Sequence, residues 1–370
     1  MATTKVSGEL VDLNEATSES GLKMPTGTNN NRPTAAAGQI RNNTNETSDG
    51  SASCEEYYNG TAWKKINNVA FPVYYSTLTW TGDSSGTYPV TSSKDITGLG
   101  FQPDYVVVKR RDGTGPFTNF DSNRGDFQYY YWNSNSASGN TGSGTYPGGI
   151  GALSDGIKVW DDSAGNYGVN GPGNSYIAYC WRANGGNTSS NSDGSATSTV
   201  QVNTAAGFSI AGMTWASAGS IGHGLGSTPE FILLKASSSA EDWQVYHTAM
   251  GTGNYMKLND TAGITARADS FSTVNSTIVT NSWTGASVDW IMYSFVSVAG
   301  FSKFGSYTGN ATAGQAITTG GFFRVQAQNA EDTANAPNLD ITATGFEINA
   351  NGVFQGLNAS GNLYIYAAFK

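Results

Sequence analysis

The apolar residues of this chain gather in short runs, and two of these runs follow the same glycine-rich turn. Residues 96–109 and 221–235 both contain Gly-Leu-Gly, two variable residues, proline, an acid, an aromatic residue, three aliphatic residues and lysine. The glycines permit positive φ in the turn, and the proline fixes the backbone before the strand. The aliphatic run then has the length and composition of a strand in the core of a β-sandwich.

A second element closes each repeat. Residues 176–181, 290–295 and 364–369 each carry an aromatic residue at positions 1 and 6 and isoleucine at position 2. Positions 2, 4 and 6 of a strand share one face, so the isoleucine and the last aromatic ring are expected to point the same way. A Gly-Phe-Ser opening element recurs at residues 207 and 300, but the last copy has no recognisable Gly-Leu-Gly turn.

The closing elements begin at positions 176, 290 and 364, and each interval between them is as long as a domain. We therefore predict an all-β protein with an extended N-terminal arm and tandem antiparallel β-sandwich modules of jelly-roll type. The predicted parts are an arm with a short hairpin (1–67), module 1 (68–186), module 2 (187–299) and a truncated third repeat packed on module 2 (300–370). Residues 184–191 have the composition of a linker.

The segment 1–67 differs from the rest of the chain. Val6, Leu10, Val11 and Leu13 form one short apolar face, and residues 26–52 are too polar to bury a core. The Asn-Gly pair at residues 59–60 lies between β-formers, which favours a two-residue hairpin.

Composition narrows the function classes. The chain has 47 glycines, and its 13% of charged residues is about half of what soluble domains usually carry. The 12% of aromatic residues argues against disorder, and the abundance of glycine argues against helices. The net charge of −9 argues against binding to nucleic acid or anionic lipid, and no apolar run is long enough to insert into a membrane. Without a hydrophobic signal core or a cysteine framework, the chain is expected to fold in a reducing cytoplasm.

Few residues suggest chemistry, and we expect neither a metal nor a cofactor. The two histidines, His223 and His247, are too isolated for a metal site or a catalytic triad. Asp155, Asp161 and Asp162 could pair for glycoside hydrolysis or offer oxygen ligands to Ca²⁺, although their spacing does not match the twelve-residue calcium loop. A solvated turn is the favoured interpretation, so no catalytic residue is predicted.

An aromatic run at residues 127–132 offers a candidate interface. As a strand it places Tyr130 and Trp132 on one face, opposite Phe127, Tyr129 and Tyr131. If one face serves the core, large rings remain on the other, as in protein interfaces and sugar-stacking surfaces. Tyr130 and Trp132 are therefore candidates for an interface or a ligand platform. Trp160 and Tyr167 could extend this surface.

Several segments resemble tail fibres and related virion structural proteins of tailed bacteriophages, especially marine and cyanobacterial phages. In the arm these are residues 22–28, 32–33, 38–44 and 58–63. In the repeats they are the Gly-Leu-Gly-x-x-Pro turn, the Phe-Asp-Ser-x-Arg-Gly motif at 120–125 and the Tyr-x-Ala-Tyr-Cys-Trp motif at 176–181.

The resemblance covers most of the chain and brings no catalytic residues. It implies a non-enzymatic virion protein, assembled in the host cytoplasm, that binds tail, baseplate or capsid proteins through its arm. The residues expected to dock the arm on the particle are Val6, Leu10, Val11 and Leu13. Fibres of this kind are commonly homotrimers, and a host-surface glycan is the expected external ligand. A capsid decoration or head-fibre protein and a polysaccharide-degrading tailspike are the alternatives.

Overall fold

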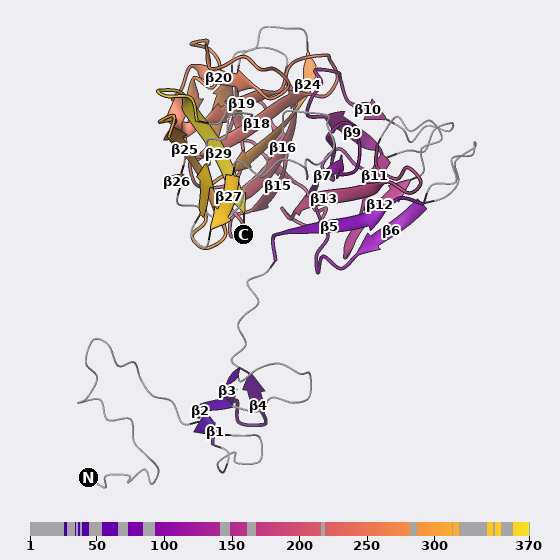
Figure 1. Ribbon diagram of the computed structural model, residues 1–370, viewed down its shortest axis with the longest axis vertical. Coiled ribbons are helices and arrows are strands. Elements are labelled where there is room, and N and C mark those ends of the chain that lie inside the picture. Colours follow the sequence, from indigo (N-terminus) through magenta and orange to yellow (C-terminus); the bar gives the residue numbers. More distant parts are fainter. Residues whose placement is uncertain are drawn as a thin grey trace, which may run out of the picture. The chain divides into compact units, whose positions relative to one another are not determined.

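A computed structural model describes residues 26–27, 34, 36–37, 39–43, 54–65, 73–83, 93–140, 149–160, 168–215, 219–281, 287–312, 314–317, 339–342, 345–348 and 358–369. The chain divides into two compact units, Met1–Val73 and Tyr74–Lys370 (Figure 1). The fold is all-β, as predicted, and its strand pairs are antiparallel except for the first. Among the described residues, the only helical segment is a single 3₁₀ turn, η2 (Thr248–Met250). None of them forms a helix with the length and apolar character that a membrane crossing requires.

The N-terminal unit contains a small sheet where an extended arm was predicted. Its strands, in the sheet order β1-β2-β3-β4, are β1 (Thr26–Gly27), β2 (Ile40–Asn43), β3 (Cys54–Tyr58) and β4 (Trp63–Lys65). Arg41 is buried, and its guanidinium lies over the ring of Trp63, which also contacts the ring of Tyr58. The apolar face of Val6, Leu10, Val11 and Leu13 lies outside the described residues.

The predicted hairpin joins β3 and β4, but its turn is longer than expected. Tyr58 pairs with Trp63, which leaves a four-residue loop. The side-chain oxygen of Asn59 accepts hydrogen bonds from the amides of Thr61 and Ala62, both at 2.9 Å. This side chain replaces part of the backbone pairing of a two-residue turn, and Gly60 adopts the required positive φ of 96°.

Module 1 is a sandwich of two sheets. The larger has the order β10-β9-β8-β7-β13-β5 and the smaller β11-β12-β6. The strands are β5 (Tyr75–Thr81), β6 (Ser93–Thr97), β7 (Tyr105–Arg110), β8 (Thr118–Asp121), β9 (Gln128–Tyr131), β10 (Gly139–Asn140), β11 (Gly149–Leu153), β12 (Gly156–Trp160) and β13 (Ser175–Trp181).

Module 2 repeats this plan and adds β14 and β15 at one edge. Its sheets have the orders β14-β15-β16-β24-β18-β19-β20-β21 and β17-β23-β22. The strands are β14 (Ser189–Asn191), β15 (Ser198–Asn203), β16 (Phe208–Trp215), β17 (Gly219–Gly222), β18 (Phe231–Ala236), β19 (Gln244–His247), β20 (Asn254–Lys257), β21 (Thr265–Ala266), β22 (Thr273–Val274), β23 (Ile278–Asn281) and β24 (Val288–Phe295).

The third repeat keeps only part of the plan. It has a pair β25-β29 and a sheet β26-β28-β27. Its strands are β25 (Ser302–Thr308), β26 (Gln315–Ile317), β27 (Leu339–Thr342), β28 (Gly345–Ile348) and β29 (Leu363–Phe369). Phe369 pairs with Ser302, whereas the equivalent Phe295 pairs with Phe208, so the two Gly-Phe-Ser elements are offset by one residue in register.

Strand order defines what the third repeat lacks. In modules 1 and 2, the first and second strands of the small sheet are separated by residues 98–148 and 223–272, which include β7–β10 and β18–β21. The corresponding segment of the third repeat, between β26 and β27, is residues 318–338 and is less than half as long. The sequence of this shorter segment contains no Gly-Leu-Gly turn.

Each module has its own core, and a third core joins them. Val106 and Val108 of β7 face the core of module 1, and Ile232 and Leu234 of β18 face the core of module 2. The alternate residues of both strands face a shared core between the two large sheets. Phe304 of β25 belongs to this shared core, and Ile365 and Phe369 of β29 pack against it. The large sheets are therefore covered on both faces.

The segment predicted as a linker, residues 184–191, is firmly held. Its first residues surround the carboxylate of Asp104 with backbone amides, and its last three form β14. Among the described strands, each sheet takes its members from only one of the segments 68–186, 187–299 and 300–370. All three segments nevertheless belong to one compact unit because of the shared core.

Candidate functional site

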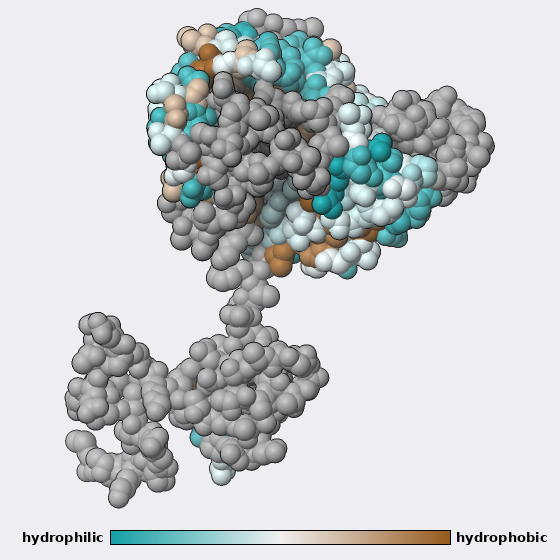
Figure 2. All heavy atoms as spheres, in the orientation of Figure 1, coloured by the Kyte–Doolittle hydropathy of each residue, from teal (hydrophilic) through white to brown (hydrophobic). Residues whose placement is uncertain are grey.

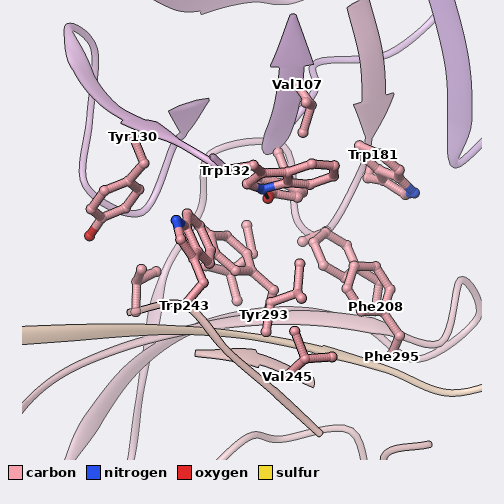
Figure 3. Close-up of a cluster of buried hydrophobic side chains, with 14 of the residues drawn as sticks. Val107, Tyr130, Trp132, Trp181, Phe208, Trp243, Val245, Tyr293 and Phe295 are labelled. Atoms are coloured by element: carbon pink, nitrogen blue, oxygen red, sulfur yellow. Dashed lines mark hydrogen bonds between the residues drawn. The ribbon is translucent and has the colours of Figure 1, made fainter. Parts of the chain in front are cut away.

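The candidate aromatic residues Tyr130 and Trp132 lie in the shared core. Both are buried, and the ring of Tyr130 meets Trp243 of module 2 edge-on, with 5.4 Å between ring centroids. Figure 3 shows these two residues on one side of the core, with Trp243 and Tyr293 facing them. The indole of Trp132 donates a hydrogen bond to the hydroxyl of Tyr105 at 2.8 Å. These rings form an interface within the chain.

Tyr130 and Trp132 thus face module 2 and not the solvent. The rings on the opposite face of β9 are those of Tyr129 and Tyr131. Both residues are half-buried, and their ring centroids lie 5.2 Å apart. Trp160 lies in the small sheet of module 1, half-buried, with its ring 4.3 Å from that of Phe127. Since Trp160 belongs to a different sheet from Tyr130 and Trp132, the structure does not bring these candidates into one surface. Tyr167 lies outside the described residues.

A buried ion pair of module 1 lies at the same seam and accepts a hydrogen bond from module 2. The Nε of Arg124 lies 2.6 Å from Asp121, whose carboxylate also accepts a 2.6 Å hydrogen bond from the hydroxyl of Tyr293 in module 2. The guanidinium lies 3.7 Å above the ring of Tyr130. Burial disfavours the charged guanidinium, but Asp121, Tyr130 and Tyr293 together outweigh this effect and raise the pKa of Arg124. Asp121 and Arg124 both belong to the Phe-Asp-Ser-x-Arg-Gly motif. The spacing between the acid and the arginine in this motif is the sequence feature from which the ion pair could have been predicted.

Beside this ion pair, a polar groove of about 570 Å³ opens between the modules. Arg124 lines it, and its Nη2 is buried without a hydrogen-bond partner in the described structure. The rest of the lining is mainly hydroxyl and amide groups, with one carboxylate, that of Asp289. Asp289 accepts a 2.6 Å hydrogen bond from Thr214. Such a mixture of donors and acceptors suits a polyhydroxylated ligand.

Asp104, the acid of the first repeated turn, has a structural role that the sequence did not reveal. Its carboxylate is fully buried and accepts hydrogen bonds of 2.6–2.8 Å from the four amides of residues 183–186. Ser122 donates a fifth, at 2.7 Å. In module 2 the equivalent Glu230 accepts a hydrogen bond from Ser297. The shared acid therefore fastens the end of each closing strand.

Both histidines are buried structural groups. Nδ1 of His223 accepts a hydrogen bond from the amide of Leu225, and Nδ1 of His247 accepts one from Ala249 at the start of η2. Burial lowers the pKa of both, and that of His247 to about 4.

Asp155 is exposed, and its carboxylate accepts hydrogen bonds from the amides of Gly98 and Gly100. It thus caps the first Gly-Leu-Gly turn. Asp161 and Asp162 lie outside the described residues. Within the described parts of the chain, no three His, Cys, Asp or Glu side chains gather closely enough to hold a metal ion. Cys180 is a free thiol buried in β13.

Comparison with known proteins gives one match. A family described as a domain of unknown function (DUF7483) matches residues 72–324, which include both complete modules. Searches of curated proteins and of solved structures found no match. The matched segment takes in both sides of the shared core, as expected if the paired modules are the unit of the family. Because the match extends over more than half of its length, the chain belongs to the DUF7483 family.

Proposed function

We propose that this protein is a non-enzymatic virion structural protein, a tail fibre of a tailed bacteriophage that attaches by its N-terminal region and contributes to host-surface adhesion. The observation that carries the proposal is the division of the chain. A small separate unit, Met1–Val73, precedes a compact unit of three related β-modules. This arrangement suits a protein that is anchored at one end and presents a folded surface at the other.

The compact unit has properties that an extracellular appendage needs. Its modules are held by a shared aromatic core and a buried ion pair, and a buried ion pair is screened only weakly by salt. Figure 2 shows polar residues predominating on the described part of one face. The polar groove beside Arg124 is the proposed contact for a host-surface glycan.

Antibody labelling of purified particles tests the proposal. Gold-conjugated antibody against residues 74–370 should decorate tails in electron microscopy. Label confined to heads would instead favour a capsid decoration or head-fibre protein. Release of reducing sugar from host polysaccharide by the purified protein would contradict the non-enzymatic assignment and favour a tailspike.

Attachment through the N-terminal region has its own test. Deletion of residues 1–20 removes Val6, Leu10, Val11 and Leu13. The truncated protein should fold but no longer enter particles, whereas the full chain should. Normal incorporation would disprove the attachment role. Incorporation as a homotrimer is expected and is measurable by mass photometry of protein released from particles.

Adhesion through the polar groove is tested by Asp289→Ala, which removes the exposed carboxylate of the groove. Adsorption of particles to host cells should fall at least severalfold. Asp269→Ala is the matched control, because Asp269 is also an exposed carboxylate and lies outside the groove. Equal adsorption of both variants and the unaltered particle would disprove glycan contact at this site.

A further inference from the structure

Among the described strands, β29 of the third repeat has a neighbour on one edge only, where the closing strands of the other modules have two. The closing strand β13 pairs with β5 on one side and β7 on the other, and β24 pairs likewise with β16 and β18. Strand β29 pairs with β25 alone among the described strands. No described strand pairs with the backbone N–H and C=O groups along its other edge, which is seven residues long.

A groove follows this other edge. It has a volume of about 790 Å³ and is bordered by residues 361–367 in succession, together with Phe369. Successive side chains of a strand point to opposite faces, so a groove that touches every residue runs along the edge of β29 and not over one face. Residues 256–258 and 260–264 also border it. We call this space the β29 groove.

The lining of the β29 groove is apolar. Aromatic side chains of the shared core contribute to it, among them Trp132, Trp181 and Phe231. Ile264 and Leu363 also line it and are 45% and 40% exposed. In the described part of Tyr74–Lys370 they are the only exposed large apolar side chains. Apolar residues left exposed together in this way are typical of an interaction surface.

The charge of the groove is balanced. Strand β29 has no charged residue between Leu363 and Phe369. Lys257 and Asp260 border the groove 4.0 Å from each other, and Lys257 also pairs with Asp242 at 2.7 Å. The groove therefore favours an uncharged apolar segment over a strongly acidic or basic one.

We propose that the β29 groove binds an extended apolar segment of a different protein, which adds to the sheet as a strand antiparallel to β29. Strand addition of this kind gains affinity from backbone hydrogen bonds and specificity from alternate side chains. The equivalent positions in modules 1 and 2 hold β7 and β18, both antiparallel to the closing strand and rich in apolar residues.

The repeats also indicate why the segment comes from another protein. Strand β7 pairs with β8 and β13, and β18 pairs with β19 and β24. A second copy therefore has no spare strand of this type among its described residues. The inference does not depend on a role in a virion, because it rests only on strand pairing and the lining of the groove.

The test uses a synthetic peptide of residues 229–236, the β18 sequence, with blocked ends. The full chain should bind it in isothermal titration calorimetry. Leu363→Lys, which places a charge in the groove at an exposed position, should weaken binding at least tenfold. Val73→Lys is the matched control, since Val73 is 46% exposed and lies outside the groove lining. Both variants should keep the thermal midpoint of the unaltered chain.

A second peptide, N-methylated at alternate residues, keeps the side chains but loses backbone donors. It should not bind, and equal binding would overturn strand addition. Absence of binding by the unmodified peptide would overturn the proposal. If the peptide binds only after residues 318–338 are deleted, the chain itself is the occupant, and the proposal is likewise overturned. Self-association of the full chain that Leu363→Lys abolishes would identify a second copy as the occupant and equally overturn it.

Discussion

At the scale of single residues, the carboxylate of Asp104 shows how a repeated acid contributes to stability. It is fully buried, and five donors satisfy it. Charge-assisted hydrogen bonds contribute more than neutral ones, and backbone amides that lose their acceptor remain poorly solvated. The residue therefore fixes the chain reversal after β13, where Gly185 and Gly186 both have positive φ.

Asp104→Asn should lower the free energy of unfolding by about 3 kcal/mol, because one oxygen and the negative charge are lost while the amides stay in place. Urea denaturation followed by tryptophan fluorescence measures this change. Asp95→Asn is the control, since Asp95 forms an exposed ion pair with Lys158 and should cost less than about 1 kcal/mol. Equal effects of the two substitutions would contradict the role assigned to Asp104.

His247 should make stability depend on pH between about 4 and 6.5. Burial lowers its folded-state pKa from 6.5 to about 4, with Glu230 acting against this shift and Lys303 with it. In this window the unfolded state binds more protons, so stability rises with pH and falls as the solution is acidified. A shift of this size corresponds to about 3 kcal/mol.

His247→Asn tests this dependence because asparagine keeps an acceptor for the amide of Ala249 and does not titrate. The pH dependence of the thermal midpoint between 4 and 6.5 should become flatter. A residual slope from His223, whose pKa is lowered in the same direction, is expected. The carboxylates of Asp83 and Asp242 have lowered pKa values and act at more acidic pH. An unchanged slope would contradict the assignment.

At the scale of elements, the repeated sequence pattern predicted the main strands and one of their faces. The expectation that positions 2, 4 and 6 of the closing elements share a face is confirmed, since Ile291, Tyr293 and Phe295 all lie in the shared core. The alternation of apolar residues was sufficient for this because it depends only on strand geometry. The same reasoning offered Tyr130 and Trp132 as interface candidates but could not identify the surface that they meet. Strand β9 has rings on both faces, and its covered face is set by Trp243, which lies far along the chain in module 2.

The ion pair at this seam is expected to stabilise the pairing of the modules only when both of its charges are present. Arg124→Met leaves the buried carboxylate of Asp121 without its cation and should cost about 3–5 kcal/mol. The double variant Asp121→Asn/Arg124→Met removes both charges and should be less destabilised than Arg124→Met alone. A double-mutant cycle in urea measures the coupling. Additive losses would show that the two side chains act independently.

At the scale of the whole molecule, the shared core explains why three repeats behave as one compact unit. Each large sheet has one apolar face that its own small sheet cannot cover, and a sheet with two apolar faces needs a layer on each. The modules therefore depend on one another. Sequence reasoning recognised the repeats but assigned them a serial arrangement, because short apolar strands do not record how many layers will cover them.

Cooperative unfolding follows from the shared core. Scanning calorimetry of the full chain should show one main transition for Tyr74–Lys370, separate from any transition of Met1–Val73. Module 1 expressed alone as residues 74–186 would expose Tyr105, Val107, Trp132 and Trp181. It should bind the dye ANS and aggregate, whereas residues 74–370 should remain monodisperse, because an exposed apolar sheet face promotes association. A soluble, cooperatively folding fragment 74–186 would mean that the shared core is a contact between independent domains. Three resolved calorimetric transitions in the fragment 74–370 would lead to the same conclusion.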